Sequence, residues 1–83
     1  MITVYQTIKE ANIELSRKAF NHIGYLSGKR FRELYPNTEI EKKPAIEVHR
    51  EKQIECVVNH YPDSFKSEIQ KIVLDYISNP NPF

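Results

Sequence analysis

The apolar positions after residue 53 indicate a strand followed by an amphipathic helix. Ile54, Cys56 and Val58 alternate with polar residues, as in a half-buried strand. A Tyr-Pro-Asp-Ser turn follows, in which Asp63 or Ser64 can cap a helix. The helix positions share one face at spacings of three and four residues: Phe65, Ile69, Ile72, Val73, Tyr76 and Ile77. Residues upstream must supply the rest of the core that this stripe faces.

A longer amphipathic helix is predicted in the first part of the chain. We expect it to begin near Thr7, where Thr7-x-x-Glu10 is a capping box, and to end before Pro36. Gly28 weakens a helix, and an unbroken helix would turn Arg30 into the apolar arc, so a break near Gly28 is predicted. At about 100° per residue, one broad arc contains Ile8, Ala11, Ile13, Leu15, Ala19, Phe20, Ile23, Leu26 and Phe31.

The first residues fit two different elements. Ile2-Thr3-Val4-Tyr5 has the β-branched and aromatic content of a short strand. Thr3-x-x-Gln6 is also a capping box that would start a helix here instead. We favour the strand, followed by the helix from Thr7.

Two alternating segments, 45–49 and 53–58, predict an antiparallel hairpin. With a loop of about three residues around Glu51-Lys52, the apolar side chains share the face toward the core: Ile46, Val48, Ile54, Cys56 and Val58. The polar face then carries Glu47, His49 and Glu55. A two-residue loop would mix the two groups, so the pattern favours the longer loop.

These elements predict an α+β fold in the order β-α-β-β-α. Two helices cover one face of a small antiparallel hairpin, or of a three-stranded sheet that includes residues 2–5. Residues 1–78 are expected to form a single domain. Residues 79–83, Asn-Pro-Asn-Pro-Phe, cannot continue a helix and are expected to form a flexible C-terminal tail.

Composition places the chain in a broad class only. It has 83 residues, a net charge of +1 and one cysteine, Cys56, which cannot form an internal disulfide and so indicates a reducing compartment. No apolar run approaches the roughly 18–20 residues of a membrane span, and the start lacks a signal-peptide pattern. We expect a soluble, cytoplasmic protein with no membrane partner.

Basic residues are concentrated in the first part of the chain. Residues 1–36 contain six basic and three acidic residues, a net of +3, whereas residues 37–83 contain six and eight, a net of −2. Glu14 can pair with Arg17 and Lys18 along the predicted helix. Cations beside an aromatic ring suit contact with phosphates or with an acidic protein, and an ordinary solvated helix face is the alternative. The candidate binding residues are Arg17, Lys18, Tyr25, Lys29, Arg30 and Arg32.

No residue combination predicts catalysis or a bound cofactor. Cys56, His49 and His60 form the one cluster with metal or nucleophile potential. In the predicted hairpin Cys56 and His49 point to opposite faces, and four strand residues place His60 about 13 Å from Cys56, too far to share one Zn²⁺. Ser27-Gly28-Lys29-Arg30 lacks the spacing and the hydroxyl of a phosphate-binding loop. We expect no catalytic residue, no metal and no cofactor.

Three functional classes remain. The first is a non-catalytic protein-interaction module, such as a regulator, inhibitor or adaptor. It would bind another protein through the charged helix face or the hairpin edge, where a second copy could also pair to form a homodimer. The alternative is a nucleic-acid-binding protein that uses the basic first helix, although the acidic second half opposes this. A small enzyme is the third class, and no constellation of residues favours it.

Overall fold

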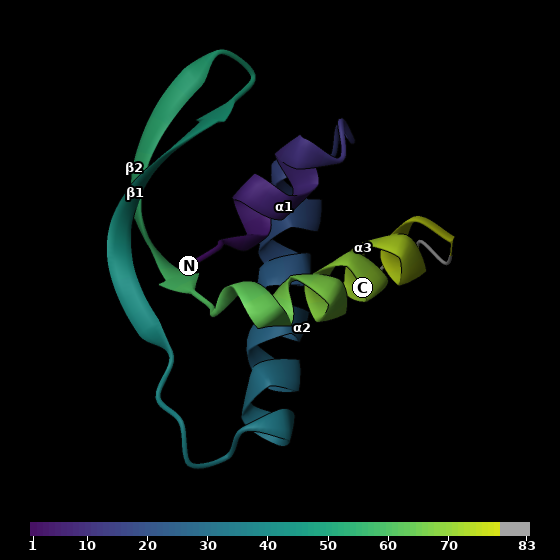
Figure 1. Cartoon of the computed structure of the whole chain (residues 1–83). Helices are drawn as coiled ribbons and strands as arrows, with labels where there is room; N and C mark the ends of the chain where they lie inside the picture. Colours follow the sequence, from purple (N-terminus) through teal and green to yellow (C-terminus); the bar gives the residue numbers. More distant parts are fainter. Residues whose placement is uncertain (79–83) are drawn as a thin grey trace.

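Residues 1–78 are described by a computed structural model, in which two helices precede a β-hairpin and a third helix follows it (Figure 1). The elements are α1 (Val4–Glu10), α2 (Arg17–Leu34), β1 (Glu41–His49), β2 (Lys52–His60), the short 3-10 helix η1 (Asp63–Phe65) and α3 (Lys66–Ser78). The predicted α+β class is confirmed. The predicted order β-α-β-β-α is wrong, because the order is α-α-β-β-α, and in the described residues the sheet is the β1–β2 pair rather than three strands. The predicted tail, residues 79–83, lies outside the described residues.

The chain begins with a helix where a strand was predicted. Thr3 Oγ1 accepts a hydrogen bond from the Gln6 amide (3.1 Å), and Gln6 Oε1 accepts one from the Thr3 amide (3.0 Å). This capping box satisfies two amides at the start of α1 with neighbouring side chains. Of the predicted strand at residues 2–5, Ile2 alone forms a β-bridge, which joins it to Tyr61.

The predicted long first helix is two helices. Thr7 lies inside α1, and the break falls at residues 11–16 rather than near Gly28. Asn12 has a φ of 55°, a left-handed conformation that does not continue a helix. Ser16 then starts α2, because its Oγ accepts a hydrogen bond from an amide one turn later (3.2 Å).

Gly28 does not break α2, and it lies where α2 approaches the end of β2. A Cβ at this position would be in ordinary van der Waals contact with Asn59 Nδ2 (3.4 Å) and Tyr61 Oη (3.6 Å), so a side chain larger than that of alanine would crowd the end of β2. Arg30, the other reason for expecting a break, is accommodated beside α3. Its Nε lies 3.4 Å from Glu68 Oε2, so a carboxylate partly offsets its charge there.

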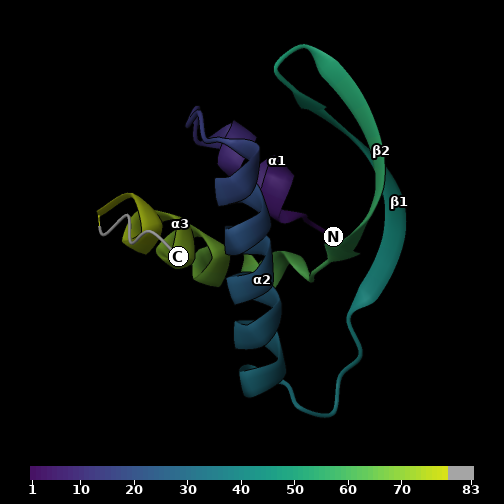
Figure 2. The ribbon, with the colours of Figure 1, turned by 180° about the vertical axis from the view of Figure 1, so that it is seen from behind.

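The core lies between the three helices and the end of β2, and α3 crosses α2 in both views (Figures 1 and 2). The ring of Tyr61 is fully buried, with its centroid 5.3 Å from that of Phe31 and 4.9 Å from that of Phe65. The stripe predicted for the last helix is confirmed, except that Ile77 is 44% exposed. The buried core residues are Ile8, Ala19, Phe20, Ile23, Phe31, Tyr61, Phe65, Ile69 and Val73.

The turn before α3 differs from the prediction in one detail. No side chain caps the start of η1. Asp63, one of the two predicted caps, instead places Oδ1 3.1 Å from the amine of Met1. This contact lies beside the Ile2–Tyr61 bridge and holds the first residues next to the end of β2.

The hairpin turn has two residues, so the predicted three-residue loop is wrong. His49 lies opposite Lys52, and the intervening Arg50 and Glu51 have φ angles of 52° and 67°. Positive φ at both central positions is the geometry of a type I′ turn, whose twist matches that of the flanking strands. Arg50 and Glu51 adopt it without the usual glycine or asparagine.

This register exchanges the predicted faces of β1. Ile46 and Val48 share the outer face with Glu55, and Ile46 is 60% exposed. Glu47 and His49, predicted to face solvent, lie on the inner face toward the helices. That face accepts them because they pair with each other at 2.9 Å and because the His49 ring packs edge-on against Phe20, with centroids 4.8 Å apart. The inner face of β2 carries Ile54, Cys56 and Val58, as predicted.

The hairpin arches beside the helices and is attached to them near each end (Figures 1 and 2). At its base, the backbones of Ile2 and Tyr61 exchange two hydrogen bonds of 2.8 Å. Near its turn, Tyr5 Oη donates a hydrogen bond to the Val48 carbonyl (3.2 Å) and accepts one from the Val48 amide (3.0 Å). Between these attachments the Asn59 side chain of β2 approaches α2 at Gly28.

Ser16, which caps α2, and Ser27, within α2, should affect the free energy of unfolding in opposite directions. Ser16→Ala removes the helix cap and should lower the free energy of unfolding by about 1 kcal/mol. Ser27 is fully buried, and its hydroxyl has no hydrogen-bond partner among residues 1–78. Ser27→Ala should therefore raise the free energy of unfolding by about 1 kcal/mol. Urea unfolding of both variants measures this, and a destabilised Ser27→Ala would contradict the packing described for α2.

Candidate functional site

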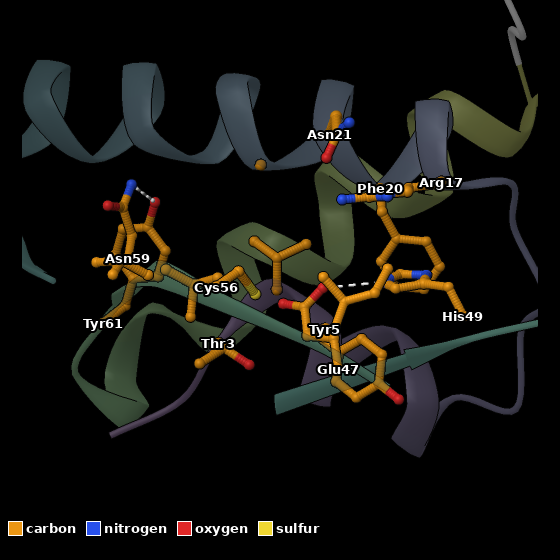
Figure 3. Close-up of a pocket in the computed structure, with 15 residues that line it drawn as sticks. Thr3, Tyr5, Arg17, Phe20, Asn21, Glu47, His49, Cys56, Asn59 and Tyr61 are labelled. Atoms are coloured by element: carbon orange, nitrogen blue, oxygen red, sulfur yellow. Dashed lines mark hydrogen bonds and ion pairs between the residues drawn. The ribbon is translucent and has the colours of Figure 1, made fainter. Parts of the chain in front are cut away.

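A cavity of about 300 Å³ lies between α2 and the hairpin (Figure 3). One side is formed by Arg17, Asn21 and Gly24 of α2, and the other by residues 56–59 of β2. The start of α1, residues 3–5, contributes to the same cavity. We call this space the α2–β2 groove.

The groove lies over the inner face of the hairpin, to which Glu47, His49 and Ile54 contribute, and it extends along β2. Four consecutive residues line it: Cys56, Val57, Val58 and Asn59. Successive side chains of a strand point to opposite faces, so contact with all four residues brings the groove up to the backbone of β2. Four strand residues span about 13 Å, which sets the length of the groove.

Two contacts show which backbone groups of the hairpin point outward. Val48 and Tyr61 exchange hydrogen bonds with groups outside the hairpin, namely the Tyr5 hydroxyl and the Ile2 backbone. Since antiparallel strands alternate between paired and outward positions, Glu55 and Val57 of β2 also present their N–H and C=O groups outward. Neither has a backbone partner beyond the hairpin within the described part of the chain.

The opposite edge of the hairpin is obstructed. On β1 the outward positions include Pro44, which has no N–H, and Val48, whose N–H and C=O already bind the Tyr5 hydroxyl. Proline and covered backbone groups are ordinary ways of blocking an exposed strand. The β1 edge is therefore blocked at Pro44 and Val48 but not at Ile46, and we call the edge of β2 at Glu55 and Val57 the open edge.

The glycines of α2 define where the groove opens. A Cβ at Gly24 would meet nothing within 4 Å, whereas one at Gly28 would meet the side chains of Asn59 and Tyr61. Asn59 Nδ2 also donates a hydrogen bond to Tyr61 Oη (3.1 Å) at this end. The groove is thus narrow near Gly28 and open from Gly24 toward Arg17.

Polar side chains on the floor of the groove are engaged with one another. Glu47 Oε1 and His49 Nε2 are 2.9 Å apart, and the two side chains are 15% and 10% exposed. Figure 3 shows the Glu47 carboxylate on the side of His49 that faces Cys56. The prediction that Cys56 and His49 point to opposite faces is wrong, because both lie on the inner face.

The Cys56 thiol lacks the features of an activated nucleophile. Burial raises the pKa of Cys56, the nearby Glu47 carboxylate raises this pKa further, and the Arg17 guanidinium opposes these effects. Its Sγ lies 3.7 Å from the Ala45 carbonyl oxygen, which it contacts in place of an imidazole. A thiol with a raised pKa is protonated at neutral pH, whereas catalytic cysteines have lowered pKa values. Within the described residues, no group of three or more His, Cys, Asp and Glu side chains could hold a metal ion.

The structure distributes the six predicted binding residues over several places. Arg17 lines the groove. Arg30 lies between Glu68 and Glu33, at 3.4 and 4.0 Å, so its charge is partly offset. Arg32 extends toward Gly28, where its Nη1 would lie 3.7 Å from a Cβ. The remaining residues are Lys18, Tyr25 and Lys29, which are exposed, and no ion pair within residues 1–78 involves either lysine. They do not form one cationic cluster with Arg17 and Arg30.

Several groove residues were not among the predicted site residues. Asn21 and Gly24 follow Arg17 by four and seven positions, so helical spacing alone places them on one face with it. Val57, and Glu55 on the same edge outside the groove, can be recognised only from the hairpin register, which depends on a turn without a glycine signal. Glu47 and His49 were assigned to the wrong face for the same reason.

None of the protein-family models, curated proteins or solved structures compared with this chain matches it. In the part of the chain that the structure describes, no helix is both long and apolar enough to span a membrane.

Alkylation of Cys56 should report the charges around the groove. We expect the rate with iodoacetamide to rise with pH around a midpoint above that of an exposed cysteine, because burial and Glu47 raise the thiol pKa. Glu47→Gln should lower the midpoint, and Arg17→Gln should raise it. Lys18→Gln is the control, since Lys18 does not line the groove. Rates measured between pH 6 and 11 test this, and identical midpoints in all variants would contradict the described placement of these charges.

The same pKa shift has a consequence for stability. The folded protein retains the thiol proton to higher pH than the unfolded chain does. Cys56 therefore contributes fully to the free energy of unfolding below the ordinary pKa of a thiol, and this contribution is lost as the pH rises through the raised pKa of the folded state.

Proposed function

We propose that this protein is a non-catalytic interaction module that binds an extended segment of another protein as an added β-strand. The segment would pair with the open edge of β2, beside the α2–β2 groove. The observation that supports this most directly is that the outward backbone groups of Glu55 and Val57 have no partner among residues 1–78. Strand addition obtains affinity from backbone hydrogen bonds, and outward N–H and C=O groups at Glu55 and Val57 are what it requires.

The chain itself uses this edge once. Ile2 pairs with Tyr61 through two backbone hydrogen bonds of 2.8 Å, which is a one-residue strand addition at the base of β2. Beyond Tyr61 toward the hairpin turn, the same edge continues to Val57 and Glu55. A partner segment would extend along the edge that Ile2 already occupies at its end.

The dimensions suit a short extended segment. The volume of about 300 Å³ is at the lower end for ligand sites, and the length of about 13 Å accommodates three to four extended residues. Gly24 leaves room on the helix side, because a Cβ there would touch nothing within 4 Å. The outer face beside the groove is also apolar, since Val57 is 65% exposed. An added strand can cover part of that side chain as a cross-strand neighbour.

A pair of proline substitutions tests the open edge directly. Glu55 and Ile46 are opposite each other in the hairpin, and each presents its N–H outward, on β2 and β1 respectively. Nine-residue peptides selected from a random display library on the intact protein serve as probes. Glu55→Pro should weaken their binding at least about tenfold, because it removes one backbone donor from the open edge. Ile46→Pro, the matched control, should leave binding unchanged in fluorescence anisotropy.

A second variant separates lost binding from lost folding. Gly24→Leu fills the groove, yet it replaces glycine within α2 by a better helix former, worth about 1 kcal/mol. We expect it to abolish peptide binding without lowering the midpoint of thermal unfolding. Equal effects of the two proline variants, or unimpaired binding by Gly24→Leu, would overturn the proposal. So would a homodimer that dissociates in Glu55→Pro, because a second copy would then occupy the edge.

Nucleic-acid binding is the second candidate function. The observation that favours it is the exposed strip of Lys18, Tyr25 and Lys29 on α2, where Tyr25 is 61% exposed and neither lysine has an ion-pair partner within residues 1–78. Affinity for single-stranded RNA should then fall as salt rises. Lys18→Gln/Lys29→Gln should reduce the slope of log affinity against log salt by about 0.7 for each lost phosphate contact. Absence of binding at 20 mM salt, or an unchanged slope, would remove this candidate.

A further inference from the structure

Building on strand addition to β2, we propose that the added segment carries a large apolar residue opposite Val57 and, two residues later, a lysine or arginine opposite Glu55. Both side chains would lie on the outer face of the hairpin. The inference rests on the proposed function and names the chemistry of the segment.

The chain's own contact with the edge of β2 indicates the direction of pairing. Ile2 pairs with Tyr61 in the antiparallel sense, through two backbone hydrogen bonds of 2.8 Å. A segment that pairs in the same sense further along β2 has one residue directly opposite each outward residue of the strand. Because the two strands run in opposite directions, the segment residue opposite Val57 precedes the one opposite Glu55, with one residue between them.

These two segment residues meet the outer face of the hairpin. Residues directly opposite each other in an antiparallel pair point to the same face, with Cβ atoms about 4.5–5.5 Å apart. Glu55 and Val57 are both exposed on the outer face, whereas Cys56 between them lies on the inner face. The side chains of Glu55 and Val57 are therefore the cross-strand neighbours that an added segment must match.

Glu55 favours a basic neighbour. The positions nearest to it on the outer face carry no charge: Ile46 directly across, Pro44 and Val48 diagonally across, and Gln53 and Val57 along β2. No ion pair within residues 1–78 involves Glu55. A lysine or arginine opposite Glu55 would place the first opposite charge beside it on this face. Cross-strand pairs of opposite charge are favourable, and like charges directly opposite each other are unfavourable.

Val57 favours an apolar neighbour. Its side chain is 65% exposed, and Pro44 lies directly across from it on β1, so the apolar surface continues away from the open edge. An aromatic or β-branched residue opposite Val57 would remove part of this surface from water. The segment is therefore expected to have the order apolar, any residue, basic.

A charge-reversal cycle on the selected nine-residue peptides tests the basic position. Replacing the basic peptide residue by glutamate should weaken binding to the wild type about fivefold. On Glu55→Lys the glutamate peptide should instead bind about fivefold more tightly than the parent peptide. Glu55→Lys keeps the backbone N–H that Glu55→Pro removes, so it reports on the carboxylate alone. Glu51→Lys, the matched control, makes the same change in net charge within the hairpin turn and should behave like the wild type.

A second pair of variants tests the apolar position. Replacing the apolar peptide residue by serine should weaken binding to the wild type about fivefold, but binding to Val57→Ser by less than about twofold, because the apolar neighbour is then missing. Val48→Ser is the matched control. It makes the same substitution on the outer face of β1, which an added strand on β2 does not adjoin, and should retain the full effect.

The outcomes separate the two proposals. Peptides that lose affinity for Glu55→Pro but show the same charge preference on wild type and Glu55→Lys would overturn the segment pattern and leave strand addition intact. So would a preference that Glu51→Lys reverses equally, or peptides in which the basic residue precedes the apolar one. Selection of no peptide, or of peptides indifferent to Glu55→Pro, would overturn both. Tighter binding of the glutamate peptide by Glu55→Lys is a gain, so it cannot be ascribed to unfolding of the variant.

Discussion

The burial of Tyr61 is the constraint on which the arrangement of this molecule depends. Its ring packs against Phe31 of α2 and Phe65 before α3. Its backbone N–H and C=O groups both form hydrogen bonds with the backbone of Ile2. One residue thus joins the end of the hairpin, the start of the chain and the helical core. Burial also raises the pKa of its hydroxyl, against the effects of Asn59 and Arg32, so the ring remains neutral within the apolar cluster.

The groove follows from this attachment. The hairpin is attached to the core at Tyr61, and it contacts the helices again near its turn, at Val48 and His49. The part of β2 between these attachments is therefore held at both ends, and its outward backbone groups at Glu55 and Val57 have no partner among residues 1–78. Gly24 and Gly28 keep the facing side of α2 free of long side chains. The hairpin is therefore held in place by its ends, and its middle remains accessible from α2.

Sequence patterns predicted the last helix well, because its stripe of Phe65, Ile69 and Val73 is both periodic and buried. They failed where a local contact outweighed propensity. Residues 4–10 form a helix because the Thr3–Gln6 capping box starts it, although the first residues are rich in β-branched side chains. Single-residue propensities do not show which of these two effects is larger. The apolar arc also continued across residues 11–16, so periodicity did not reveal the break between α1 and α2.

The hairpin register was the error that mattered for the candidate site. Hydrophobic alternation assumes that polar residues face solvent, but Glu47 and His49 satisfy each other and pack against Phe20. The outer face of the hairpin is not covered by other residues within residues 1–78. Its side chains are therefore exposed whether they are apolar or polar, and hydrophobic alternation does not identify this face. Because each face carries both apolar and polar side chains, the turn determines the register. The type I′ turn consists of Arg50 and Glu51, and it lacks the asparagine and glycine by which such turns are usually recognised in a sequence. Arg17 was found because charge is visible in the sequence, while its place in a groove required the fold.

The difference between the two edges of the hairpin limits how far any assembly built on it can extend. A sheet with two free edges can add strands in both directions and propagate into a filament. Here Pro44 and the Tyr5 hydroxyl block two outward positions of β1, so continuous pairing along that strand is interrupted. Copies that added strands at both edges of this hairpin would therefore lose backbone hydrogen bonds on the β1 side, which disfavours a filament.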